Sequence, residues 1–112
     1  LTQKLSHTDG QIIWSYPAEE IYNQIRALNP EPGTWTTWQN KVLKIIEAEP
    51  LTAVPTTLGQ AGLVTKYPDR RVAVRTGTAP LLLVRVQLEG AQEMNMNQFL
   101  TGHPNFIDSV LV

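Results

Sequence analysis

The chain has 112 residues and a formal net charge of -1, so its size fits one domain and its bulk charge gives no reason to expect a nucleic-acid partner. It contains no cysteine, which excludes disulfides and thiolate chemistry and fits a cytoplasmic location. No signal peptide is recognisable, and the longest apolar run, residues 81–84, is too short to cross a bilayer. The chain begins at Leu1 rather than Met, so we expect it to be part of a longer protein.

Residues 1–10 are polar and aperiodic, and we predict a linker or arm there, followed by a single domain over residues 11–112. An amphipathic helix is predicted early in this domain. Ser15 is its expected N-cap, because a hydroxyl can accept a hydrogen bond from a free backbone N–H of the first turn. The helix should end at Asn29, since a residue before proline is pushed away from the helical conformation. Its apolar stripe consists of Ala18, Ile21, Tyr22, Ile25 and Leu28.

The rest of the sequence is mostly short strands separated by turns. The five predicted strands are residues 34–39, 42–49, 63–67, 71–75 and 81–88. The last of them alternates, with Arg85 and Gln87 on one face. Its apolar face is predicted to hold Leu82, Val84, Val86 and Leu88. These strands, with the helix across them, favour a mainly β fold, a small open Greek-key β-barrel resembling the oligonucleotide-binding (OB) fold; the alternative is an open antiparallel α+β sheet.

A second short helix is predicted over residues 96–101. Asn95 can cap it, Gln98 stands at the position of a capping-box partner, and Gly102 is a suitable stop. The tail, residues 103–112, is weakly patterned. Its apolar part is the expected contact surface if the chain is a free-standing protein-interaction module.

Residues that carry catalytic chemistry are few. His7 and His103 lie in segments expected to be flexible and have no second ligand at metal spacing, so neither a metal site nor a catalytic residue is predicted in this chain. Glu19 and Glu20 fit a helix start, where they complement the helix dipole, better than a catalytic dyad. No glycine-rich phosphate loop and no nucleophile elbow is present.

Basic residues gather in the strand-rich part, where seven cations outnumber four acids between residues 34 and 89. These candidates for phosphate contacts are Lys41, Lys44, Lys66, Arg70, Arg71, Arg75 and Arg85. If their strands pair, several share one face and can bind an RNA backbone; the alternative is an ordinary solvated surface. Trp35 and Trp38 are expected on opposite faces of one strand, one in the core and the other either a stacking platform or a cap on the barrel.

Arg26 borders the apolar stripe of the first helix. Its stem can cover apolar surface, or its charge can form a structural ion pair or a contact to a neighbouring domain. The sequence leaves these alternatives open.

Three stretches together resemble the C-terminal domain of methionyl-tRNA formyltransferase. They are KLS from Lys4, AEEIYNQIRALNPEPGTW from Ala18, and LLLVRVQLEG from Leu81 with the methionine and QFLTG that follow. The resemblance keeps order and spacing from Lys4 to about Gly102. Its most specific part is the helix end, IRALNP, with the proline and glycine after it.

The resemblance implies an open OB-like barrel that presents positive charge to initiator methionyl-tRNA and helps to orient it. It also implies a parent enzyme that transfers a formyl group from 10-formyltetrahydrofolate, its co-substrate, to the methionine amino group of initiator tRNA. The catalytic residues would lie in an N-terminal catalytic domain that this chain lacks. This domain would need no cofactor, its partners would be that N-terminal domain and the tRNA, and no membrane contact is expected.

The sequence departs from the family pattern in two places. The family often carries two lysines where this chain has Ala91 and Gln92, and usually a GDG turn where this chain has Gly77 to Pro80. Binding of tRNA by the isolated domain should therefore be weak and salt-sensitive. The alternatives are the equivalent domain of a 10-formyltetrahydrofolate hydrolase or dehydrogenase, or of a sugar N-formyltransferase, where it would be a spacer or help to close the folate site.

Overall fold

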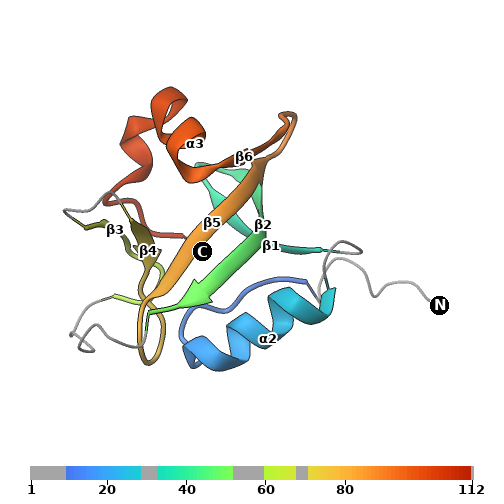
Figure 1. Ribbon diagram of the computed structural model, residues 1–112, viewed down its shortest axis with the longest axis vertical. Coiled ribbons are helices and arrows are strands. Elements are labelled where there is room, and N and C mark those ends of the chain that lie inside the picture. Colours follow the sequence, from blue (N-terminus) through green and yellow to red (C-terminus); the bar gives the residue numbers. More distant parts are fainter. Residues whose placement is uncertain (1–9, 29–32, 52–59, 68–70, 112) are drawn as a thin grey trace.

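The computed structural model describes residues 10–28, 33–51, 60–67 and 71–111. Its elements are helix α2 (Ala18–Leu28), strands β1 (Thr34–Trp38), β2 (Lys41–Pro50), β3 (Val64–Lys66), β4 (Val72–Val74), β5 (Leu81–Leu88) and β6 (Glu93–Asn95), helix α3 (Met96–Gly102) and the 3-10 turn η1 (Pro104–Phe106). Figure 1 shows the sheet between the two helices, with α2 at one end and α3 at the other. In this described part, neither helix has the length and apolar character needed to cross a membrane.

All six strands pair antiparallel, in the order β1-β2-β5-β4-β3, and β6 also pairs with β5. The predicted fold class, mainly β with two short helices, is confirmed. Strand β6 was missed by the sequence prediction because three residues carry too little periodicity to be recognised. Within the described residues β1 and β3 do not pair with each other, so closure of a barrel stays a prediction.

Both end strands of the sheet are covered by segments outside the named strands. The segment before α2 runs parallel to β1, and Trp35 exchanges backbone hydrogen bonds of 2.9 Å with Gly10 and Ile12. Along β3, both backbone groups of Val64 bond to residues 108–109, again at 2.9 Å. Exposed strand edges invite association with other chains. Here the edge groups are satisfied by local chain segments.

The ladder between β2 and β5 contains two register shifts, both between Ile45 and Ala48. Such bulges change the alternation of a strand by one residue. As a result Leu83 lies in the core, 2% exposed, while its neighbours Leu82 and Val84 are only half-buried. The predicted apolar face of residues 81–88 was therefore wrong at Leu82 and Val84, because a strict period of two does not allow for an extra residue.

Helix α2 begins at Ala18, two residues later than an N-cap at Ser15 predicts. The backbone N–H of Ala18 donates to the Thr78 hydroxyl oxygen at 2.9 Å, across 60 positions of sequence. The prediction of Ser15 as N-cap was wrong, because a hydroxyl from the β4–β5 connection occupies that role. The predicted stripe is confirmed at Ala18, Ile21 and Ile25, which are buried. The predicted helix end at Asn29 lies outside the described residues.

Helix α3 is capped as the sequence predicts. The Asn95 side-chain oxygen accepts from the Gln98 backbone N–H at 2.9 Å, and the Gln98 side-chain oxygen accepts from the Asn95 backbone N–H at 3.2 Å. The helix ends at Gly102. A short helix of this kind depends on its cap and on packing, because propagation alone contributes little over seven residues.

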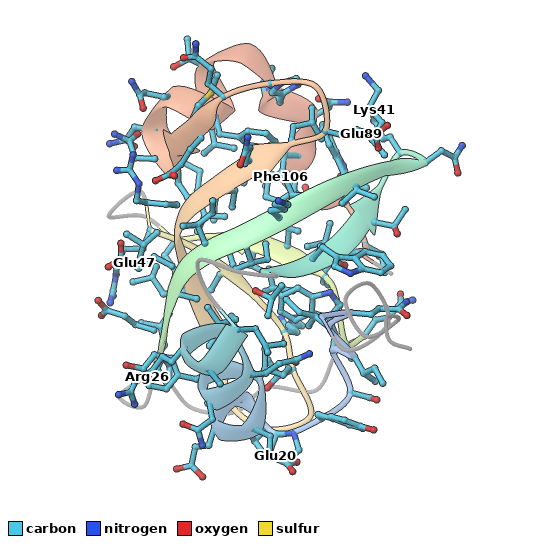
Figure 2. All side chains as sticks on the ribbon, turned by 90° about the vertical axis from the view of Figure 1, so that its right-hand side faces the viewer. Glu20, Arg26, Lys41, Glu47, Glu89 and Phe106 are labelled. Atoms are coloured by element: carbon cyan, nitrogen blue, oxygen red, sulfur yellow. The ribbon has the colours of Figure 1, made fainter. Side chains whose placement is uncertain are left out.

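The C-terminal tail is part of the core, contrary to the prediction of a flexible segment with an exposed contact surface. Phe106 is fully buried in the interior (Figure 2), and its ring lies edge-on to those of Trp38 and Phe99, with centroids 5.3 and 5.1 Å apart. His103 packs on the Phe99 ring at 4.6 Å. Among the described tail residues only Val110 is an exposed large hydrophobic side chain.

Replacing Thr78 by Val should destabilise the domain, because the Ala18 N–H loses its acceptor while the side-chain shape is kept. Loss of a helix cap costs about 1 kcal/mol, so the urea midpoint should fall without a change in slope. Thr78→Ser keeps the hydroxyl and is the matched control. Equal losses in the two variants would show that the hydroxyl does not cap α2.

Replacing Phe106 by Ala should lower the free energy of unfolding by about 3–5 kcal/mol, because a buried aromatic ring leaves a cavity. Val110→Ala should change it by less than about 0.5 kcal/mol, as expected at an exposed site. Urea unfolding followed by tryptophan fluorescence measures both. If the alanine variant does not fold, the free energy of unfolding of Phe106→Leu can be compared with that of Val110→Ala instead. Similar values at Phe106 and Val110 would contradict a core position for the tail.

Candidate nucleic-acid interface

The outer sheet face, the side of β1, β2, β5 and β6 that points away from the core, carries one aligned row of side chains. Trp35 lies opposite Lys44, Lys44 opposite Gln87, and Gln87 opposite Glu93. All four side chains are half-buried or exposed. Trp38 is 4% exposed and lies in the core, so the predicted division between the two tryptophans is confirmed. A stacking role for Trp35 stays a prediction.

Carboxylates offset the cations on the outer sheet face. Arg85 Nε donates to Glu93 Oε2 at 2.5 Å, and the two side chains are 40% and 43% exposed. Glu47 lies opposite Arg85 in register. Such exposed pairs add little stability, but they leave this face without a net positive charge.

The Glu89 carboxylate accepts from the Val42 backbone N–H at the start of β2 at 2.8 Å. Lys41 is close to Glu89 in Figure 2, but it pairs with the core residue Trp38 and so does not belong to the outer sheet face.

A second group of cations borders helix α3. Lys66 lies with Asn97 and Thr101 around a hollow of about 400 Å³. Arg71 lies with Asn95 and Asn97 around a neighbouring hollow of about 310 Å³, whose floor is apolar. Because Asn97 lines both hollows, we name them together the α3 groove. Its polar rim consists of Lys66, Arg71, Asn95, Asn97 and Thr101.

The described lining of the α3 groove contains no carboxylate. Lys66 and Arg71 are both exposed, and the Arg71 guanidinium lies over the Tyr67 ring, 6.0 Å from its centroid. The Asn97 amide adds two N–H donors at the rim. The groove thus combines cations and neutral donors, the set of groups that binds an anion.

The other predicted site residues lie elsewhere. Arg75 follows β4, is half-buried, and donates its backbone N–H to the Leu63 carbonyl at 3.0 Å. Arg26 is exposed on α2, with its guanidinium 5.4 Å from the centroid of the Tyr22 ring. Its structural or interdomain role stays a prediction. Arg70 lies outside the described residues.

Sequence reasoning missed the side chains that α3 contributes to the groove. In the sequence Asn95 signals only a helix cap, and Asn97 and Thr101 carry no signal. Strands β4 and β6 both pair with β5, which already pairs with β2 along its other edge, so β4 and β6 share one edge. Helix α3 follows β6 directly and therefore lies beside β4. No local pattern encodes this arrangement.

In the part of the chain that the structure describes, no three His, Asp or Glu side chains lie close enough together to hold a metal ion. His103 is half-buried against aromatic rings. His7 lies outside the described residues.

The family model that matches this chain and three of its curated relatives all belong to formyltransferases. The family described as formyl transferase, C-terminal domain, matches residues 4–104. Methionyl-tRNA formyltransferases from Akkermansia muciniphila and Syntrophus aciditrophicus are 38% and 39% identical over 108 residues, covering 94% and 96% of this chain. The enzyme of that name from Anaeromyxobacter dehalogenans is 42% identical over 91 residues, 80% of the chain. The chain spans about a third of the length of these relatives, 34%, 34% and 29%.

A solved structure shares the fold. HypX from Aquifex aeolicus superposes with a TM-score of 0.68 at 13% sequence identity, covering 94% of this chain and 19% of HypX. Identity this low shows likeness of fold alone. The family match spans nearly the whole sequence and includes the residues that carry the resemblance seen in the sequence. The chain therefore belongs to the formyl transferase C-terminal domain family.

Proposed function

We propose that this chain is the C-terminal domain of a methionyl-tRNA formyltransferase, and that it helps to bind and orient the initiator tRNA. The observation that carries the proposal is the identity of 38–42% to relatives that bear this enzyme's name. In such an enzyme the formyl group passes from 10-formyltetrahydrofolate to the methionine amino group on the tRNA. The folate site and the catalytic residues would belong to an N-terminal domain.

The α3 groove is the surface that we assign to the tRNA backbone. Lys and Arg bind phosphate through charge, and Asn amides add neutral hydrogen bonds. A local cluster of cations can attract a polyanion even when the net charge of the chain is -1. The outer sheet face attracts RNA less, because carboxylates accompany its cations. There Trp35, opposite Lys44, offers a stacking surface for an unpaired base.

A second candidate is a formyltransferase relative that does not act on tRNA, such as a 10-formyltetrahydrofolate hydrolase or a sugar N-formyltransferase. The likeness to HypX favours this second candidate. HypX has the same fold at only 13% sequence identity, and a fold alone does not determine function. A relative of this kind should bind initiator tRNA no better than it binds heparin, another polyanion.

Titration of the 112-residue chain with initiator tRNA should show weak binding whose log affinity falls with log salt, with a slope of about 0.9 for each phosphate neutralised. Lys66→Glu with Arg71→Glu should lower the affinity by about tenfold or more and flatten this slope by about two. Lys41→Glu with Lys44→Glu makes the same change in net charge on β2, away from the α3 groove, and its effect should be smaller. Fluorescence anisotropy at several salt concentrations measures all three proteins.

Two results would contradict the assignment. Equal losses in the two double variants would mean that net charge, and not the α3 groove, governs binding. An unchanged Michaelis constant for tRNA in the full-length enzyme carrying the Lys66 and Arg71 substitutions would remove the groove from the tRNA interface.

A further inference from the structure

The segment that leads into α2, residues 10–17, is fastened to the domain along its length, and we call it the strap. Its start is hydrogen-bonded to β1 through the backbone of Trp35. At its middle, Trp14 Nε1 donates to the Thr36 hydroxyl at 2.9 Å in a buried site. Near its end, the Tyr16 carbonyl accepts from the Gly77 N–H at 3.0 Å. Attachment at three points holds the strap in one orientation.

Glycine at position 77 allows this close approach. A Cβ atom there would lie 2.1 Å from the Ser15 carbonyl oxygen, which is closer than real Cβ contacts allow. Gly10 is similar, since its Cβ would lie 2.3 Å from the Gly33 carbonyl oxygen. The strap therefore has no room to shift toward the domain at either end.

The strap divides its large side chains between two sides. Ile12 and Trp14 are 1% and 4% exposed and belong to the core, while Ile13 and Tyr16 are 46% and 50% exposed. The Tyr16 N–H donates to the Ile13 carbonyl at 3.1 Å, so a turn brings these two residues together. They are two of the three large hydrophobic side chains that are exposed in the described residues, and the third is Val110. Because the strap is fastened, neither can turn inward.

We propose that Ile13 and Tyr16 form a docking patch for the folded part of the same polypeptide that precedes this domain. The inference rests on the proposed function, in which this domain is the C-terminal part of a longer enzyme. The matched family is described as a C-terminal domain, and the relatives are about three times as long as this chain. The patch lies on the strap, next to the point where the preceding chain arrives.

The size of the patch favours a tethered occupant over a second copy of this chain. A stable interface between separate proteins buries roughly 1,200–2,000 Å², far more than two half-exposed side chains provide. A tethered partner needs much less, because the linker holds it at a high effective concentration. The occupant should present an apolar surface to Ile13 and a polar group at its border to the Tyr16 hydroxyl, since a buried tyrosine O–H usually finds a partner.

The test uses the full-length protein with Ile13→Ser and Tyr16→Ser together, and Val110→Ser as the matched control. In the double variant, hydrogen exchange at strap amides and at the facing surface of the preceding domain should become about tenfold faster or more, because the buried apolar area that holds the two parts together is reduced. The Val110 variant should exchange like the parent protein. The 112-residue chain carrying the double substitution should keep its urea midpoint, because both side chains are exposed in it.

Unchanged exchange in the full-length double variant would overturn the proposal. So would a lower urea midpoint in the 112-residue variant, which would assign both side chains to this domain's own fold. Concentration-dependent dimerisation of the 112-residue chain that the double substitution abolishes would make a second copy the occupant and would also overturn it. The exchange experiment contains no tRNA, so a failed tRNA titration combined with faster exchange would reject the proposed function and keep the docking patch.

Discussion

The antiparallel ladder between β2 and β5 is the constraint on which the rest of the structure depends. It runs from the Leu43–Leu88 pair to the Pro50–Leu81 pair and is the longest pairing of the described sheet. Strand β1 continues the sheet from β2, β4 and β6 attach along the free edge of β5, and each helix packs on one of the two central strands. The register shifts near Ile45 and Ala48 let both residues reach the core although they are three positions apart. One buried cluster thereby joins both helices and the sheet.

The same register decides where the charge of the molecule lies. Pairing of β5 with β6 brings Arg85 to Glu93, and pairing of β2 with β5 places Glu47 opposite Arg85, so the outer sheet face is close to neutral. The α3 groove differs because Lys66 and Arg71 come from the other arm of the sheet, where the described lining holds no acid. A protein with a net charge of -1 can in this way keep one local surface suited to phosphate. The proposed tRNA contact follows from this separation of charge, together with family membership.

The segments that cover the two edge strands stabilise the sheet, and one of them, the strap, is also the part of the domain that a preceding domain would meet. The strap covers the edge of β1, and the tail covers the edge of β3, so neither strand offers free backbone groups along the bonded stretch. At the same time the strap is held rigidly by Trp14, and the helix that follows it is capped by Thr78 from the β4–β5 connection. A chain arriving from another domain would thus meet a fixed, partly apolar surface instead of a flexible tether. The contacts that protect the edge of β1 also expose Ile13 and Tyr16.

The sequence by itself determined the features that depend on neighbouring residues: the strand at residues 81–88, the buried stripe of Ile21 and Ile25, and the capping box at Asn95. It also determined the family, through motifs spread over nearly the whole chain. For the site, the sequence identified the candidate cations but did not predict which of them lie together on one surface. Only the tertiary structure decided that Thr78 caps α2, that Phe106 fills the core, and that α3 borders Lys66 and Arg71. Local patterns follow from the fixed periods of helix and strand, whereas these contacts join segments far apart in sequence, and they form only when the packed core and the β2–β5 register bring those segments together.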